Sequence, residues 1–244
     1  MSAMKVVERW YSQRVEREVT LARWGHFGTP VLVFPTAGGD AEEIERMHLV
    51  GACGELLDAG RIKIYSCDSI AGKAMVENEG DFSFRTKLLN QFQQMIAEEI
   101  VPAIHADCGG QQLPMVAAGA SIGAFNALAV QCRYPWTFRT SICMSGSYRL
   151  QRFLGGDYSP DLYLSSPLDY LPGLEGPVLD QLRRGFVLLT SGEGAWEAIG
   201  ESWEVANILG TKGIPNRVDS WGTDWEHGWD TWRAMLPAYL REFT

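Results

Sequence analysis

The sequence PMVAAGASIGAFNALAVQCRYP, residues 114–135, contains in succession the two elements from which an α/β fold is built. Its first part is a short apolar run, which is typical of a strand buried on both faces of a sheet. Its second part is rich in small and apolar residues and predicts a helix that ends before Pro135. Ser121 lies where the two parts meet, between Gly119 and Gly123.

The rest of the chain repeats this alternation of short apolar runs and longer helical patterns. A mostly parallel sheet with helices on both faces is therefore expected, in a single domain of 244 residues. The strands are expected within residues 18–25, 30–39, 61–67, 114–121, 138–147, 186–194 and 217–222. We expect the first two of these to pair antiparallel, because little helix separates them. The longer helices are expected at 41–60, 84–105, 122–134, 201–210 and 229–243.

One stretch departs from this rhythm. Residues 148–185 are rich in glycine, proline, tyrosine and leucine, and only a short part of them has a helical pattern. Irregular insertions in such folds lie above the strand ends. We therefore expect residues 148–185 to cover a substrate pocket at the carboxyl ends of the strands.

Composition excludes several classes of function. The formal net charge is −9 and the basic residues are scattered, so a nucleic-acid partner is not expected. No apolar run approaches the ~20 residues that span a bilayer. The N-terminus is charged and has no secretory pattern. Five widely spaced cysteines without a CxxC motif favour buried thiols in a reducing cytoplasm.

Ser121 is the candidate nucleophile. A serine on a sharp strand-to-helix turn places its hydroxyl above the strand ends, and flanking glycines prevent clashes in that strained turn. The positive end of the following helix also favours a developing oxyanion. GxSxG alone occurs by chance, but here an apolar strand precedes it directly and a helix follows it directly.

A nucleophilic serine needs a base and an acid, which follow it in the order acid, then histidine, in enzymes with this turn. His227 is the only one of four histidines after Ser121. The acid is expected in the loop SGEGAWEAIGES, residues 191–202, where Glu197 is favoured and Glu193 is the alternative. No spacing of histidine and cysteine indicates a metal, and no cofactor is expected.

Two backbone N–H groups must hold the oxyanion of an acyl-transfer reaction. One is expected from Ile122, the residue after the nucleophile. The other is expected from the turn TAGGD, residues 36–40, with Ala37 favoured over Gly38.

These segments resemble the esterase branch of the α/β-hydrolase superfamily, which contains the esterase D and feruloyl-esterase-like enzymes. The resemblance extends over nearly the whole chain and is carried by VLVFPTAGGDAEE, GASIGAFNA, SGEGAWE and WGTDWEHGWDTWRAMLPAYL. Members tend to have HDWPxW around the catalytic histidine, whereas this chain has HGWDTW, with Gly228 and Asp230 at the changed positions. Many relatives also have an aspartate where this chain has Ala195, and Glu197 resembles the glutamate of a related subgroup.

The resemblance implies an α/β-hydrolase fold and a serine carboxylesterase of small acyl, aryl or sugar esters. Tyr148 and Trp229 are expected to bind the substrate, among several aromatic residues near the pocket. An acyltransferase with the same triad and a non-catalytic ligand-binding relative are the alternatives. The C-terminal helix and exposed aromatics are compatible with a homo-oligomer.

Overall fold

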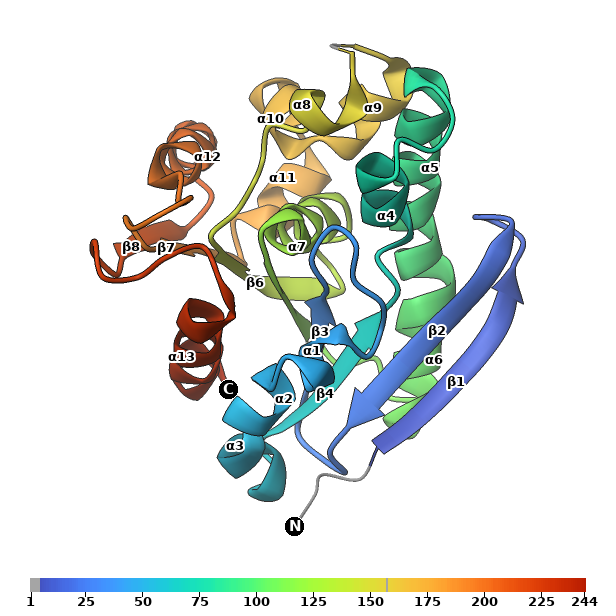
Figure 1. Cartoon of the computed structure of the whole chain (residues 1–244), viewed down its shortest axis with the longest axis vertical. Coiled ribbons are helices and arrows are strands. Elements are labelled where there is room, and N and C mark those ends of the chain that lie inside the picture. Colours follow the sequence, from blue (N-terminus) through green and yellow to red (C-terminus); the bar gives the residue numbers. More distant parts are fainter. Residues whose placement is uncertain (1–4, 157) are drawn as a thin grey trace.

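The computed structural model describes residues 5–156 and 158–244, which form one eight-stranded sheet with helices on both faces (Figure 1). The strand order is β1-β2-β4-β3-β5-β6-β7-β8, and the pairs from β4 to β8 are all parallel. This confirms the predicted fold class. The strands are β1 (Lys5–Ser12), β2 (Arg17–Trp24), β3 (Thr29–Phe34), β4 (Ile62–Cys67), β5 (Met115–Ala120), β6 (Phe138–Met144), β7 (Phe186–Ser191) and β8 (Asn216–Ser220).

The sheet separates two hydrophobic cores. Alternate residues of one strand enter opposite cores: Leu32 and Phe34 enter one, while Val31 and Val33 enter the other. The first core is covered by α4 (Ile70–Val76), α5 (Phe82–Met95), α6 (Val101–Asp107), α7 (Ile122–Arg133) and α12 (Ile199–Thr211). The second is covered by α1 (Glu43–Arg46), α2 (Leu49–Ala52), α3 (Gly54–Asp58) and α13 (Trp229–Phe243). Burial of both sheet faces explains why the central parallel strands β3 and β5 are largely apolar.

Residues 148–185 contain short helices that add to the first core: α8 (Gln151–Leu154), α9 (Pro160–Ser165), α10 (Pro167–Tyr170) and α11 (Pro177–Leu182). Helix α9 is attached to α5 by hydrogen bonds from Asn90 to Asp161 (2.7 Å) and from Gln93 to the Ser165 carbonyl (2.8 Å). No helix of the described residues is both long and apolar enough to cross a membrane.

Three details differ from the sequence prediction. The expected antiparallel pairing of the first two predicted strands is wrong, since β2 pairs antiparallel with β1 and β4, and β4 lies between β2 and β3. Strand β1 was not predicted, because it is largely exposed and carries no apolar alternation. The predicted helix 41–60 is broken into α1, α2 and α3, with His48 in a left-handed conformation (φ 62°) between the first two.

The predicted helix 84–105 is present with one irregularity. Helix α5 continues through a π-helical turn, Ile96–Ile100, directly into α6. A π turn inserts one extra residue and rotates the apolar positions that follow it. Ile96, Ile100 and Ile104 are nevertheless all fully buried.

Candidate active site

The turn at Ser121 joins β5 to α7 in a strained conformation. Ser121 has φ 57° and ψ −122°, a region that a residue with a Cβ adopts only when its surroundings hold it there. Its N–H donates to the carbonyl of Met144 (3.0 Å), and its carbonyl accepts from the N–H of Ser147 (3.2 Å). Both contacts come from the end of the neighbouring strand β6, so the sheet itself holds the turn.

The two flanking glycines are required by close backbone contacts. A Cβ on Gly119 would lie 2.3 Å from the Gly123 carbonyl oxygen, and a Cβ on Gly123 would lie 2.5 Å from the carbonyl oxygen of Phe34. The start of α7 therefore packs directly on the end of β3. This explains the spacing of the glycines around Ser121 in physical terms.

His227 lies between β8 and α13, with its side chain hydrogen-bonded to Glu197. The Nδ1–Oε2 distance is 3.4 Å, and the ring packs edge-to-face on Trp232 at a centroid distance of 5.2 Å. The His227 side chain remains partly exposed (23%), whereas the Glu197 side chain is almost completely buried (1%). The favoured acid is therefore the one that the structure brings to the histidine.

Four donors surround the Glu197 carboxylate. Besides His227 they are Ser145 Oγ (2.6 Å), Ser191 Oγ (3.1 Å) and the Gly192 N–H (3.2 Å). Burial acts to raise the pKa of Glu197, but the hydrogen bonds from His227 and Ser145 outweigh it and hold the pKa below its ordinary value. The carboxylate is therefore charged at neutral pH and can orient and stabilise a protonated imidazole.

Glu193 occupies a different position. Its carboxylate accepts a hydrogen bond from Ser220 Oγ (2.5 Å) at the end of β8 and is solvent-exposed. Within the described ranges it has no hydrogen bond to His227. Of the two glutamates, only Glu197 thus contacts the base.

Ser145 was not predicted from the sequence, and Trp232 was noted only as part of the HGWDTW motif. Trp232 Nε1 donates to Ser145 Oγ (2.9 Å), and Ser145 Oγ in turn donates to Glu197. Ser145 has φ 47° and donates its N–H to the Thr190 carbonyl (2.7 Å), which fixes it beside β7. The only sequence sign was the position of Ser145 directly after an apolar strand, in the segment MSGS.

The loops that carry the acid and the base are bonded to each other. We define the acid loop as residues 192–198, after β7, and the base loop as residues 221–228, after β8. Three backbone hydrogen bonds join them: Glu193 to Gly222 (2.9 Å), Gly194 to Trp225 (3.0 Å) and His227 to Ala195 (3.0 Å). A Cβ on Gly192 would lie 1.9 Å from the Trp225 oxygen, so the loops also pack in direct contact.

Ser121 and His227 line one cavity of about 190 Å³. In the described residues no hydrogen bond joins the two side chains, which is common in unliganded sites where catalytic contacts are still long. The cavity wall also includes Arg152 and Phe153 from α8 and Trp196 from the acid loop. Trp196 has a strained backbone (φ 65°), and its large apolar side chain is 90% exposed at the mouth of the site.

The expected oxyanion donors, Ile122 and Ala37, follow two adjacent strands, β5 and β3. Phe34 of β3 pairs with Gly119 of β5, so the turn after β3 and the Ser121 turn leave the sheet side by side. Ile122 is the first residue of α7, where N–H groups have no acceptor within the helix. Among the described residues no acceptor takes the N–H of Ala37.

A glutamate holds the turn that contains Ala37. The Glu43 carboxylate accepts from both the N–H and the hydroxyl of Thr36 (2.8 Å each). Gly38 lines a different cavity together with Asp40 and Lys73. Neither Ala37 nor Gly38 is among the residues that line the cavity with Ser121, so the choice of Ala37 over Gly38 as the second donor stays a prediction.

The two aromatic residues expected to bind substrate are placed elsewhere. Tyr148 is 1% exposed and belongs to the first core, where its ring covers Gly146. Trp229 packs edge-to-face on Trp232 at a centroid distance of 5.0 Å. Neither lines the cavity with Ser121, and the aromatic wall is formed by Phe153 and Trp196 instead.

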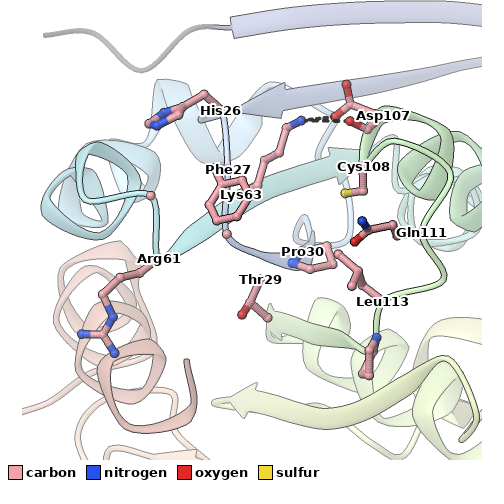
Figure 2. Close-up of a pocket in the computed structure, with 13 residues that line it drawn as sticks. His26, Phe27, Thr29, Pro30, Arg61, Lys63, Asp107, Cys108, Gln111 and Leu113 are labelled. Carbon is pink, nitrogen blue, oxygen red and sulfur yellow. Dashed lines mark hydrogen bonds and ion pairs between the residues drawn. The ribbon is translucent and has the colours of Figure 1, made fainter.

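A larger cavity of about 710 Å³ lies at the opposite end of the strands, near the starts of β3 and β4 (Figure 2). Figure 2 shows Lys63 pointing to Asp107, and the Nζ–Oδ2 distance is 2.5 Å. Asp107 also forms an ion pair with Arg23 (3.0 Å) and accepts a hydrogen bond from the Tyr65 hydroxyl (2.7 Å). The Asp107 charge is thus already paired within the protein, and the candidate nucleophile and base lie at the other end of the strands.

Comparisons with known proteins identify the family of this chain. The family model described as "Putative esterase" matches residues 85–243, more than half of the chain. Among proteins with curated descriptions, none matches this chain in sequence.

Solved structures share the fold at low identity. They include a ferulic acid esterase (TM-score 0.74, 14% identity, 100% of this chain and 99% of that one). The Mycobacterium tuberculosis protein MPT51 gives a TM-score of 0.72 at 18% identity, with 99% of this chain and 98% of that one covered. An S-formylglutathione hydrolase from Agrobacterium tumefaciens gives 0.70 at 13% identity, with 99% and 94% covered. A strained serine turn on an eight-stranded sheet, together with the family match, shows that this chain belongs to the esterase family of α/β-hydrolases and is a carboxylic ester hydrolase.

Proposed function

We propose that the protein is a serine carboxylesterase that uses Ser121, His227 and Glu197 as its triad. The observation that carries the proposal is the strained Ser121 turn, which shares one cavity with a histidine that is hydrogen-bonded to a buried, charged glutamate. This combination is costly to maintain in a fold and is typical of a nucleophile with its base and orienting acid.

The reaction follows from these positions. His227 Nε2 accepts the Ser121 hydroxyl proton while Oγ forms a bond to the ester carbonyl carbon. The N–H groups of Ile122 and Ala37 hold the resulting oxyanion. His227 then gives the proton to the leaving alcohol as the C–O bond breaks, and an acyl-serine remains.

The second half of the reaction repeats these roles with water. His227 takes a proton from water, whose oxygen attacks the acyl carbon, and Ser121 leaves with the proton. Glu197 stays ionised throughout and stabilises the imidazolium. No cofactor takes part in this proposal.

The segment 148–185 forms the roof of the pocket in this proposal, since Arg152 and Phe153 contribute to the cavity wall. A cavity of about 190 Å³ is below the usual size of sites for drug-sized ligands and suits a small acyl group. All five cysteines are unpaired, and burial raises the pKa of Cys53 and Cys143 to about 12. Unreactive thiols of this kind support a reducing compartment such as the cytoplasm.

Hydrolysis of 4-nitrophenyl acetate and butyrate tests the triad. Ser121→Ala is expected to abolish turnover, because the other hydroxyl groups in the cavity wall, those of Ser145 and Ser147, are hydrogen-bonded to Glu197 and Arg152. Glu197→Gln is expected to lower kcat by several orders of magnitude, on the order of 10³–10⁴, since an amide cannot stabilise the imidazolium. The measurement is nitrophenolate release at saturating ester.

Glu193→Gln is the matched control, because it makes the same change on an exposed carboxylate that does not contact His227. Equal activity in wild type and Ser121→Ala, or no activity in wild type, would refute the triad, and the absence of activity would favour a ligand-binding protein. Transfer of the acyl group to an added alcohol in preference to water would identify an acyltransferase with the same residues.

A further inference from the structure

The cavity that contains Ser121 has one permanently charged residue in its wall. Arg152 is the only lysine, arginine, aspartate or glutamate among its lining residues, although the whole chain has a net charge of −9. The other lining groups are serines, small residues, two aromatic rings and His227. A cation in this setting is unexpected for a site that binds only neutral esters.

The Arg152 guanidinium is held at a defined place near the nucleophile. It donates to Ser147 Oγ (3.0 Å) and lies over the Phe153 ring at 4.8 Å from its centroid. The N–H of Ser147 in turn donates to the Ser121 carbonyl. Ser147 thus links the guanidinium to the strained turn that carries the reacting hydroxyl.

Most donors of this guanidinium have no acceptor in the protein. Arginine carries five N–H donors, and Ser147 is the one acceptor within hydrogen-bond distance in the part of the chain that the structure describes. Arg152 also forms an ion pair with Glu201 Oε1 at 3.9 Å, a distance that is too long for a hydrogen bond and leaves the guanidinium N–H groups free to donate. The other oxygen of Glu201 accepts from the N–H groups of Tyr148 and Arg149.

The size of the cavity indicates which group would fill it beside Arg152. A volume of about 190 Å³ corresponds to on the order of six water-sized groups at about 30 Å³ each. A short acyl chain that ends in a carboxylate fills such a space, and its two oxygens match the paired donors of a guanidinium.

We propose that Arg152 selects esters whose short acyl group ends in a carboxylate, that is, monoesters of small dicarboxylic acids. This inference rests on the proposed function, because it concerns the acyl group that Ser121 receives. Arg152 is a specificity-determining residue in this arrangement, and it takes no part in bond making.

The test compares two stable esters with four-carbon acyl chains, monoethyl succinate and ethyl butyrate, by the acid released on hydrolysis. The first carries a carboxylate where the second carries a methyl group. The ratio of their kcat/KM values is expected to favour monoethyl succinate in wild type. Arg152→Ala is expected to lower this ratio by about tenfold, the effect of one charge-assisted contact in a partly exposed site.

Two further variants distinguish charge recognition from a structural role of the arginine. Arg149→Ala removes an exposed cation three residues earlier that pairs with Glu204 outside the cavity, and it is expected to leave the ratio unchanged. Arg152→Lys is expected to keep part of the preference for monoethyl succinate, because the lysine ammonium retains the positive charge but lacks the paired donors of arginine. Added salt is expected to reduce the preference in wild type, because the guanidinium is 56% exposed.

The outcomes separate the inference from the proposed function. Hydrolysis that needs Ser121 but shows no preference for monoethyl succinate, or a ratio lowered equally by Arg149→Ala, overturns the inference alone. Calorimetric binding of monoethyl succinate to Ser121→Ala provides a second readout. If wild type hydrolyses neither ester, tenfold weaker binding after the added Arg152→Ala change still supports the inference, and equal binding overturns it.

Discussion

Ser145 shows how much of the candidate site depends on single side chains outside the triad. Its hydroxyl accepts from the Trp232 indole and donates to the Glu197 carboxylate, so it joins the acid to the helix that follows the base. Its removal leaves a buried indole N–H without its acceptor and takes a 2.6 Å donor from a buried charge. A buried polar group that loses its partner costs the protein about 1–3 kcal/mol.

Ser145→Ala is therefore expected to raise the pKa of Glu197 toward its ordinary value. It is also expected to lower kcat by roughly tenfold, which is the usual effect of removing a residue that orients another functional residue by a hydrogen bond. The change should appear in kcat more than in KM, because Ser145 acts through Glu197. The measurement is steady-state hydrolysis across a pH series.

Ser66→Ala serves as the comparison, because the Ser66 hydroxyl is equally buried and has no hydrogen-bond partner among the described residues. An unchanged kcat in Ser145→Ala would mean that the remaining donors hold Glu197 unaided.

Among single residues, those within local motifs were predictable and those brought in by the sheet were not. Ser121, His227 and Glu197 follow from short patterns and their order along the chain. Ser145 reaches the site because it follows β6, which pairs with β5. Arg152 reaches it because α8 contributes to the cavity wall. No local sequence pattern encodes either arrangement. Tyr148 was predicted to contact the substrate but is buried in the hydrophobic core, because an aromatic residue is more often part of the core than of a pocket wall.

At the scale of elements, the contact between α7 and β3 sets the distance between the nucleophile turn and the Ala37 turn. Gly123 makes this contact possible, because its Cα lies against the carbonyls of Phe34 and Pro35. Backbone atoms cannot rotate away as a side chain can. Any atom added here must therefore move the helix relative to the strand.

Gly123→Ala is expected to destabilise the fold by about 1–3 kcal/mol, as overpacking does in a close-packed interior. It should also lower kcat/KM, since α7 carries Ser121 away from the turn that contains Ala37. Chemical denaturation and ester hydrolysis measure the two effects.

Gly210→Ala, near the end of α12, tests the same chemical change where no atom lies within 4 Å of the added methyl group. It is expected to stabilise the protein by about 0.5–1 kcal/mol, because alanine loses less entropy than glycine in a helix. Full stability and activity in Gly123→Ala would contradict this account of the helix–strand contact.

Elements were predictable where both sheet faces are buried and less so elsewhere. Strands β3, β5 and β7 are continuous apolar runs and were found near their predicted places. Strand β1 escaped prediction because it lies at the sheet edge with most side chains in solvent. The predicted helix 41–60 failed at His48, whose left-handed backbone is set by packing that no helical pattern encodes.

At the scale of the whole molecule, the two ends of the sheet have separate tasks. The carboxyl ends of the parallel strands carry the candidate catalytic residues, and the opposite end carries the ion-pair cluster of Asp107, Lys63 and Arg23. Burial acts to raise the pKa of Asp107, but hydrogen bonds from Lys63 and Tyr65 outweigh it and leave the pKa below its ordinary value.

Asp107→Asn is expected to destabilise the protein by about 3 kcal/mol at neutral pH, because Lys63 would remain buried without its counter-charge. A lowered folded-state pKa stabilises the protein above the unfolded pKa of about 4, and this contribution is lost as the pH falls through the folded value. The difference between wild type and Asp107→Asn should therefore shrink below about pH 4. Thermal or denaturant unfolding as a function of pH measures it.

Asp180→Asn breaks an exposed pair with Arg183 and is expected to cost less than about 1 kcal/mol. Asp107→Asn should leave kcat/KM unchanged at temperatures where it is folded. A loss of activity in the folded variant would show that the two ends of the sheet are coupled.

The bonded acid and base loops have a consequence for engineering this protein. Backbone hydrogen bonds and the Gly192–Trp225 contact join the two loops. An acid loop transplanted alone from another protein would therefore lose these hydrogen bonds to the base loop. Residues 192–198 and 221–228 therefore form one exchangeable module, and chimaeras that swap the two segments together should keep the imidazole oriented where single-loop swaps lose it.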